Sequence, residues 1–238
     1  MLEHLTIPEF MSLIPSQIKA IIFDLDDTLY DCSGTLVLES RKRAAKIISR
    51  AINCSEKEAL ELQLKLEEKL GPKTDIYREI ADSYNLSDKF YKEVSRIIDA
   101  PDIKGIALFP DVTASISKLK RVGYKLILVT AGNRDLQERK IKALGLEKTF
   151  DEIIIADNSS GKEKCFKEIL IRHDLKPEQV FCVGDKIKDE IEAGDNMGML
   201  TVLMKHGRYY NFYKSKINDR EPYMCIAKVS DLLKSCEN

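Results

Sequence analysis

Most of the chain alternates short apolar runs with amphipathic helical stretches, and this alternation constrains the fold more than any other feature. Strand-like runs occur at residues 18–23, 125–129, 152–156, 180–183 and 199–203. Helical patterns occur at residues 111–121, 135–144, 162–173 and 187–197. Strands that alternate with helices form a parallel sheet, because right-handed crossovers place the helices on its two faces. We therefore predict an α/β fold, a Rossmann-like, doubly wound parallel sheet.

A block without strand signals separates the first strand from the second. Its helical stretches are expected at residues 36–53, 55–70, 74–84 and 88–99. Ser55 and Glu58 have the spacing of a capping box, which begins a helix. We predict an all-helical cap domain at residues 34–107, inserted into a core made of residues 1–33 and 108–238.

Two further segments outside this pattern carry weaker predictions. The N-terminal residues, which contain two prolines and two glutamates before the first strand, are expected to form a short arm rather than a signal peptide. The polar, tyrosine-rich residues 205–222 are expected to be irregular.

Composition excludes several classes of function. The 38 Lys and Arg residues are balanced by 39 Asp and Glu residues, so attraction to nucleic-acid phosphates is not expected. The apolar runs are far shorter than the roughly 20 residues of a membrane-spanning helix. Six cysteines without a C-x-x-C pair favour a reduced, cytoplasmic protein.

Three acidic residues follow the first predicted strand in the string Asp24-Leu25-Asp26-Asp27-Thr28. Residues i and i+2 of an extended chain point the same way, so Asp24 and Asp26 can address one point. That point lies at the carboxyl end of the strand, where open α/β sheets place their ligands. An acidic turn without function is the simpler alternative, but this string after a buried strand is far rarer than such a turn.

The chain resembles the haloacid dehalogenase superfamily in four ordered motifs over nearly its whole length. Asp24, Asp26 and Thr28 match the first motif, and Thr130 in LILVTAGN matches the second. A lysine at a helix start matches the third, and the acidic string VGDKIKDE matches the fourth. The helical block resembles the first-type cap of the superfamily.

This resemblance implies a phosphatase that depends on Mg²⁺. Asp24 would be the nucleophile that forms an aspartyl-phosphate, and Asp26 would be the general acid and base. Thr130 and the Ala131 N–H would bind the phosphoryl group. The expected Mg²⁺ ligands are Asp24, the backbone carbonyl of Asp26, and Asp185, since Mg²⁺ prefers oxygen ligands.

Two assignments within the motifs stay open. Lys162 is favoured over Lys164 as the phosphate-binding lysine, because the string Ser160-Gly161-Lys162-Glu163 places Lys162 in the first helical turn. The second acid of the fourth motif is Glu190 or Asp189. Glu190 is favoured because its surroundings resemble the longer form of this motif in the superfamily, in which an Ile follows the acid and a Gly-Met lies eight and nine residues beyond it, as Ile191 and Gly198-Met199 do here.

Two features near the site have competing interpretations. The basic run from Arg41 to Arg43, with Lys46 and Arg50, suggests a substrate anion, but a solvated helix face is the more common outcome. Tyr30 either lines the substrate pocket or packs in the core.

We expect hydrolysis of a small phosphorylated metabolite, such as a nucleoside monophosphate or a sugar phosphate. A phosphomutase of the β-phosphoglucomutase type, or a binding protein that has lost turnover, are the alternatives. Nothing in the sequence indicates the oligomeric state.

Overall fold

A parallel sheet forms the centre of the protein in the computed structural model, which describes residues 15–157, 161–215 and 221–233. Within these residues the sheet has six strands in the order β3-β2-β1-β4-β5-β6. The strands are β1 (Ala20–Phe23), β2 (Lys125–Ala131), β3 (Glu152–Ala156), β4 (Val180–Gly184), β5 (Leu200–Met204) and β6 (Met224–Ile226). Every neighbouring pair is parallel, as the alternation of strands and helices predicted.

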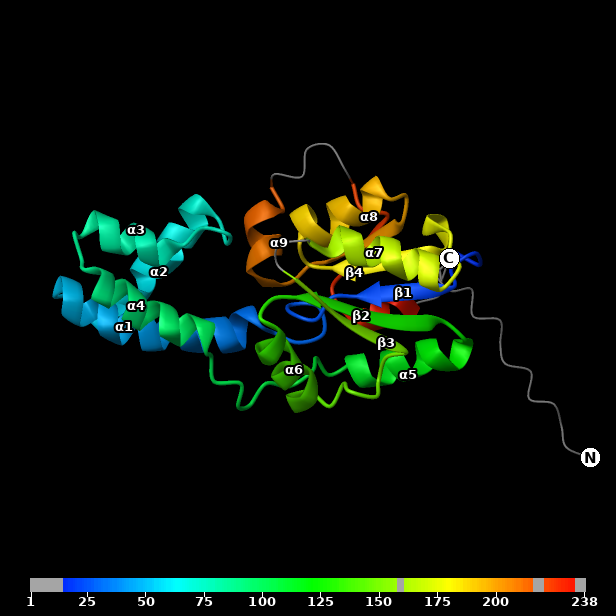
Figure 1. The fold of residues 1–238 in the computed structure, drawn as a ribbon, viewed down its shortest axis with the longest axis horizontal. Helices are drawn as coiled ribbons and strands as arrows, with labels where there is room; N and C mark the ends of the chain where they lie inside the picture. The colour runs from blue at the N-terminus through cyan, green and yellow to red at the C-terminus, as the bar shows by residue number, and fades with distance from the viewer. Residues whose placement is uncertain (1–14, 158–160, 216–220, 234–238) are drawn as a thin grey trace, which may run out of the picture.

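Helices cover both faces of this sheet (Figure 1). They are α5 (Val112–Val122), α6 (Arg134–Ala143), α7 (Gly161–Arg172), α8 (Glu192–Asn196) and α9 (Gly207–Tyr213). Ile21 of β1 packs with Ile116 of α5 in one apolar cluster, whereas the adjacent Ile22 packs with Phe166 of α7 in another. Successive strand residues thus face opposite layers, and the predicted Rossmann-like, doubly wound α/β fold is confirmed.

The block between β1 and β2 is helical and lies to one side of the sheet (Figure 1). Its helices are α1 (Leu38–Ile52), α2 (Glu56–Leu70), α3 (Ile76–Ser83) and α4 (Asp88–Asp99). They share a third apolar cluster, in which Ile48, Ile80 and Val94 are fully buried. The Ser55–Glu58 capping box is present at the start of α2. The cap domain and its boundaries at residues 34 and 107 remain a prediction.

The structure differs from the sequence prediction in the C-terminal part of the core. Residues 205–222 were expected to be irregular, but α9 occupies Gly207–Tyr213. Gly207 begins this helix with φ 81°, and a Cβ there would lie 2.5 Å from the Asp27 carboxyl carbon. A glycine at this point therefore lets the helix start against the acidic turn.

The predicted helix at residues 187–197 also proves to be two elements. A π-helical turn, Ile187–Ile191, precedes the short helix α8. Such turns are frequent at functional sites.

Two further points concern the chain as a whole. The predicted N-terminal arm falls largely on residues 1–14, which lie outside the described residues. None of the described helices combines the length and apolar character that crossing a membrane requires.

Candidate active site

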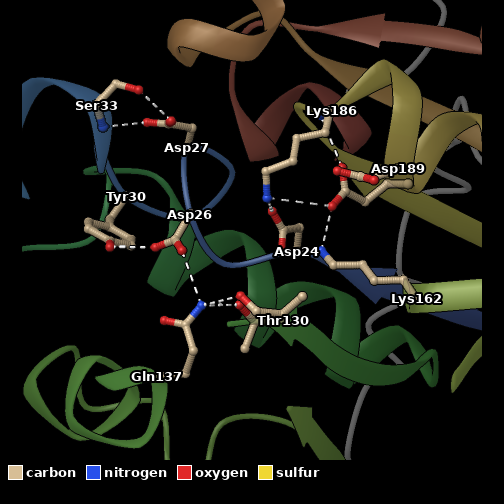
Figure 2. Close-up of polar contacts among 12 residues, drawn as sticks. Asp24, Asp26, Asp27, Tyr30, Ser33, Thr130, Gln137, Lys162, Lys186 and Asp189 are labelled. Atoms are coloured by element: carbon tan, nitrogen blue, oxygen red, sulfur yellow. Dashed lines mark hydrogen bonds and ion pairs between the residues drawn. The ribbon is translucent and has the colours of Figure 1, made fainter. Parts of the chain in front are cut away.

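The acidic string and the predicted phosphate-binding residues meet at one edge of the sheet. Phe23 of β1 is in register with Leu128 of β2 on one side and with Val183 of β4 on the other. Asp24 follows Phe23 directly, so it leaves the sheet between these two neighbouring strands. The carboxyl ends of parallel strands meet at one edge, and Figure 2 shows the resulting group of polar side chains there.

Asp24 lies in a buried cluster of opposite charges. The Lys162 Nζ contacts Asp24 Oδ1 and lies 2.5 Å from Glu190 Oε1. The Lys186 Nζ lies 3.6 Å from Asp24 Oδ2 and 3.8 Å from Glu190 Oε1. Lys164, the alternative to Lys162, is exposed. The structure therefore places Lys162, and not Lys164, beside the predicted nucleophile.

Ser160, which the capping-box argument for Lys162 used, lies outside the described residues. Lys162 is nevertheless the second residue of α7, which begins at Gly161. Its position in the first turn follows from the start of the helix itself.

Burial and charge act against each other in this cluster. Burial raises the pKa of Asp24, and Lys162 and Lys186 offset only part of that effect. Burial alone would lower the pKa of Lys162, but Asp24 and Glu190 outweigh it and the pKa is raised. The same carboxylates, with Asp185, hold the pKa of Lys186 well above its ordinary value despite burial. Both lysines are therefore charged near neutral pH.

Asp185 supplies a third carboxylate with no partner of its own. It is fully buried, and neither carboxylate oxygen has a hydrogen-bond partner among the described residues. Burial raises its pKa well above the ordinary value. Oxygen atoms of Asp24, Asp185 and Glu190 all lie within 4.8 Å of one another. A buried carboxylate without a donor is costly unless a cation satisfies it, so this set fits a divalent metal that prefers oxygen ligands.

The two acids proposed for the fourth motif face different surroundings. Glu190 is buried, and its Oε2 accepts a hydrogen bond from the Lys186 N–H at 3.0 Å. Asp189 is partly exposed and pairs instead with Lys73, between α2 and α3, at 3.1 Å. The π-helical turn places Glu190 against Gly184, where a Cβ would lie 2.7 Å from Glu190 Cγ. Of these two acids, Glu190 belongs to the acidic cluster with Asp24 and Asp185, and Asp189 does not.

Asp26 is held by donors that differ from those around Asp24. Tyr30 donates to Asp26 Oδ1 at 2.5 Å, and the Lys140 Nζ lies 3.0 Å from both carboxylate oxygens. Gln137 donates to Oδ2 at 3.2 Å. Burial raises the pKa of Asp26, but Lys140, Lys186 and the Tyr30 hydroxyl together lower it by more than burial raises it. The carboxyl group is therefore ionised in this structure. The Asp26 side chain is not part of the candidate metal cluster.

Thr130 and Ala131 end β2 beside these groups. Thr130 is buried, and its hydroxyl oxygen accepts a hydrogen bond from Gln137 Nε2 at 2.8 Å. The same amide donates to the Ala131 carbonyl at 2.9 Å. Gln137 therefore links Thr130 to Asp26, as Figure 2 shows.

Asp27, the third acid of the string, fixes the turn after β1. It adopts φ 59° and accepts hydrogen bonds from the Ser33 N–H at 2.8 Å and the Ser33 hydroxyl at 2.6 Å. The Ser33 hydroxyl oxygen in turn accepts from the Arg208 N–H at 3.1 Å. A buried, fully engaged carboxylate of this kind holds the turn in place and joins it to α9.

A cavity of about 470 Å³ opens between the sheet edge that carries Asp26 and the helical block. Asp26 and Lys140 line it from the core, and Arg41 of α1 lines it from the helical block. Arg41 is only 6% exposed, so the expectation of a solvated basic face is wrong for this residue. Its guanidinium is turned inward because Glu67 of α2 binds it at 2.5 Å.

Sequence reasoning missed several polar residues of the site. Gln137 and Lys140 lie three residues apart on α6, which follows the strand that carries Thr130. Lys186 directly follows Asp185 in the fourth motif. These positions next to motif residues were the available signal. Tyr30, for which two interpretations were open, is buried and serves as a hydrogen-bond donor to Asp26.

The chain belongs to the haloacid dehalogenase-like hydrolases, whose family model matches residues 21–204. It is 30% identical to a glyceraldehyde 3-phosphate phosphatase of Pyrococcus abyssi, over 93% of this chain and 94% of that protein. It is 26% identical to a phosphoglycolate phosphatase of Aquifex aeolicus, over 92% of this chain and 97% of that protein. These relatives confirm the expected class of enzyme, a phosphoric monoester hydrolase.

Solved structures show the same fold. A HAD phosphatase from Thermococcus onnurineus has a TM-score of 0.58 and 24% identity, covering 90% of this chain and 96% of that one. A predicted phosphoglycolate phosphatase from Haemophilus somnus has a TM-score of 0.64 and 22% identity, covering 92% of this chain and 97% of that one.

Proposed function

We propose that this protein hydrolyses a small phosphate monoester through an aspartyl-phosphate on Asp24, with Mg²⁺ as cofactor. One observation carries the proposal. A buried carboxylate at the end of β1 faces two charged lysines and an unpartnered carboxylate, Asp185. This arrangement offers both a nucleophile and the positive charge that a phosphoryl group needs.

The first step forms the covalent intermediate. A carboxylate oxygen of Asp24 attacks phosphorus, and the bond from phosphorus to the leaving oxygen breaks. Asp26 is ionised in the free protein, but the negative charge of a bound phosphoryl group raises the pKa of a neighbouring carboxyl group, so Asp26 takes up a proton from solvent when the substrate binds. It then gives this proton to the departing oxygen, which leaves as a neutral alcohol.

The second step returns the enzyme to its starting state. A water molecule attacks the phosphorus of the aspartyl-phosphate and releases inorganic phosphate, while Asp26 accepts the proton of the water. Lys162 holds the phosphoryl oxygens through its charge, and the Thr130 hydroxyl donates to one of them. Gln137, which binds both Thr130 and Asp26, keeps these two groups aligned.

Asp24, Asp185 and Glu190 are the residues whose side chains would hold the metal, together with the backbone carbonyl of Asp26. A divalent cation bound there supplies charge neutralisation between the nucleophile and the phosphoryl group. Asp189 is not proposed as a ligand because it pairs with Lys73.

The substrate is a small phosphorylated metabolite, and the cavity beside Asp26 is the proposed place of its leaving group, the alcohol that remains when the phosphoryl group is transferred. A cytoplasmic location is the companion proposal, supported by free thiols at every described cysteine: Cys32, Cys54, Cys165, Cys182 and Cys225.

The proposal is tested with purified protein and a panel of phosphorylated metabolites, by measuring released phosphate with and without Mg²⁺. We expect release from at least one compound, loss of release with EDTA, and loss in Asp24→Asn with the fold retained. Full activity of Asp24→Asn would remove the nucleophile assignment. Transfer to a second sugar hydroxyl without phosphate release would identify a phosphomutase instead.

A further inference from the structure

The cavity beside Asp26 has two arginines in its wall, one from each part of the molecule. Arg41 comes from α1 and Arg208 from α9. Arg41 Nη2 lies 2.5 Å and Arg208 Nη1 lies 2.7 Å from the same oxygen, Oε1 of Glu67 on α2. All three side chains line the cavity. One carboxylate oxygen therefore faces two guanidinium groups.

The inner wall of this cavity has excess positive charge. Lys140 is balanced by Asp26, which it contacts through both oxygens. Arg41 and Arg208 share Glu67, and these side chains are only 7%, 30% and 13% exposed. An incompletely balanced charge is costly when it is withdrawn from water, so this wall favours an additional anion.

The other charged residues of the cavity do not cancel this excess. Lys73, Asp75 and Asp99 are exposed at the rim. Asp75 caps α3 through Oδ1, and its Oδ2 accepts from Tyr91 at 2.6 Å. Lys73 pairs with Asp189. Exposed charges of this kind are screened by water and contribute little inside the cavity.

The arginine geometry suits a planar or tetrahedral anion. Each guanidinium has five N–H donors in a fixed fork, and Glu67 Oε1 takes one from each. Arginine forks bind carboxylates and phosphates through two parallel hydrogen bonds. The leaving oxygen departs at Asp26, so the rest of the leaving group extends into the cavity that these forks line.

We propose that Arg41 and Arg208 together bind a second negatively charged group, a carboxylate or a second phosphate, on the leaving group of the substrate. This inference rests on the proposed function, which sets the phosphoryl group at Asp24. The Arg208 N–H also binds Ser33, which binds Asp27. An anion held by both arginines is thus joined to the catalytic turn and to the helical block at once.

A purely structural contact between the two parts of the molecule is the alternative. The Arg41–Glu67–Arg208 contact would then hold α1 and α2 against α9 whatever the substrate. Such a contact affects all substrates equally, whereas an anion receptor affects only substrates with a second charge. The comparison must therefore be made between substrates within one variant.

The experiment uses three compounds with the same two-carbon chain: 2-phosphoglycolate, ethylene glycol bisphosphate and the singly charged-group control 2-hydroxyethyl phosphate. For the wild type, kcat/KM should be at least about tenfold higher for one of the two doubly anionic compounds than for 2-hydroxyethyl phosphate. This is the effect expected of a hydrogen bond to a charged group. The compound that is preferred identifies the carboxylate or the phosphate as the recognised group.

Arg208→Gln should lower kcat/KM for the preferred compound by about tenfold or more, and that for 2-hydroxyethyl phosphate by less than about threefold. Arg41→Lys, which keeps the charge but loses the fork, gives the same pattern and serves if Arg208→Gln does not fold. Lys46→Gln is the matched control, because Lys46 is exposed on α1 and does not line the cavity. It should leave all three values unchanged.

Equal losses of kcat/KM on all compounds, or a wild type without preference, would refute the proposal that Arg41 and Arg208 bind a second anion. The phosphatase proposal would still stand. If no compound is hydrolysed in any panel, the proposed function fails instead. The receptor is then decided by calorimetric binding of 2-phosphoglycolate, ethylene glycol bisphosphate and 2-hydroxyethyl phosphate to the wild type and Arg208→Gln. A selective loss of either doubly anionic compound supports the receptor, and equal binding of all three by both proteins contradicts it.

Discussion

Replacing Lys162 by methionine tests the charge balance of the buried cluster directly. The Lys162 side chain is 3% exposed and contacts Asp24 and Glu190, whose side chains are each 1% exposed. Methionine keeps most of the volume but removes the ammonium group, so the two carboxylates lose their shared partner. Removing one member of a buried ion pair typically costs about 3–5 kcal/mol.

The structure favours the lower end of this range. Lys186 remains 3.6 Å from Asp24 and 3.8 Å from Glu190, so part of the positive charge is retained. A loss of about 3 kcal/mol corresponds to a decrease in Tm of roughly 6–12 °C for a protein of this size. Lys164→Met is the control, because Lys164 is exposed on the same helix, and a surface change of this kind stays within about 0.5 kcal/mol.

The assay is thermal unfolding of both variants and the wild type in EDTA and in Mg²⁺. Mg²⁺ should raise the Tm of Lys162→Met more than that of the wild type, since a cation bound by the carboxylates takes over the role of the missing ammonium group. A Lys162→Met variant as stable as Lys164→Met in EDTA would refute the reasoning.

Three further predictions concern the residues around this cluster. Gly184→Ala should weaken Mg²⁺ binding about 10–100-fold, because the new Cβ would lie 2.7 Å from Glu190 Cγ and displace a proposed ligand. An unchanged Mg²⁺ affinity in calorimetry would argue against Glu190 as a metal ligand. Asp189→Asn should leave Mg²⁺ affinity unchanged and stability within about 1 kcal/mol, as Lys73–Asp189 is a surface pair, whereas Glu190→Gln should weaken Mg²⁺ binding. Burial raises the pKa of Glu67, but Arg208 and Arg41 lower it by more, so the pKa in the folded protein lies below the ordinary value of 4.5. The stabilisation by the Glu67 charge is therefore present above pH 4.5 and is lost as the pH falls through the lowered pKa. Glu67→Gln should therefore be less stable than the wild type at pH 7 by about 2 kcal/mol, and a Tm difference that does not shrink in acid would contradict this account.

The sequence predicted the sheet and the edge at which the candidate site residues meet, because both depend on local pattern. Glu152–Ala156 is apolar enough to define β3 to the residue, and Asp24 directly follows a buried strand. The carboxyl ends of neighbouring parallel strands lie at one edge of the sheet. Thr130 and Asp185, which come at the ends of two such strands, could therefore be expected beside Asp24.

Other features depend on contacts between distant segments, which a local pattern does not contain. Arg41 has the sequence signature of an exposed face, and its contact with Glu67, 26 residues away, turns it inward. Lys140 lies on a charged helix and reaches Asp26 across 114 residues. Strand β6 has only three residues, Met224–Ile226, and is defined by its pairing with β5 rather than by its composition.

The identity of the phosphorylated residue tests the central claim most directly. Wild-type protein is mixed with a substrate and Mg²⁺, quenched in acid within one turnover, and treated with borohydride, which reduces an aspartyl-phosphate to homoserine. Peptide mass spectrometry then locates the modified residue. Our account predicts homoserine at position 24 in the wild type and none in Asp24→Asn. Modification at any other residue, or turnover without a modified peptide under conditions that trap acyl phosphates, would contradict it.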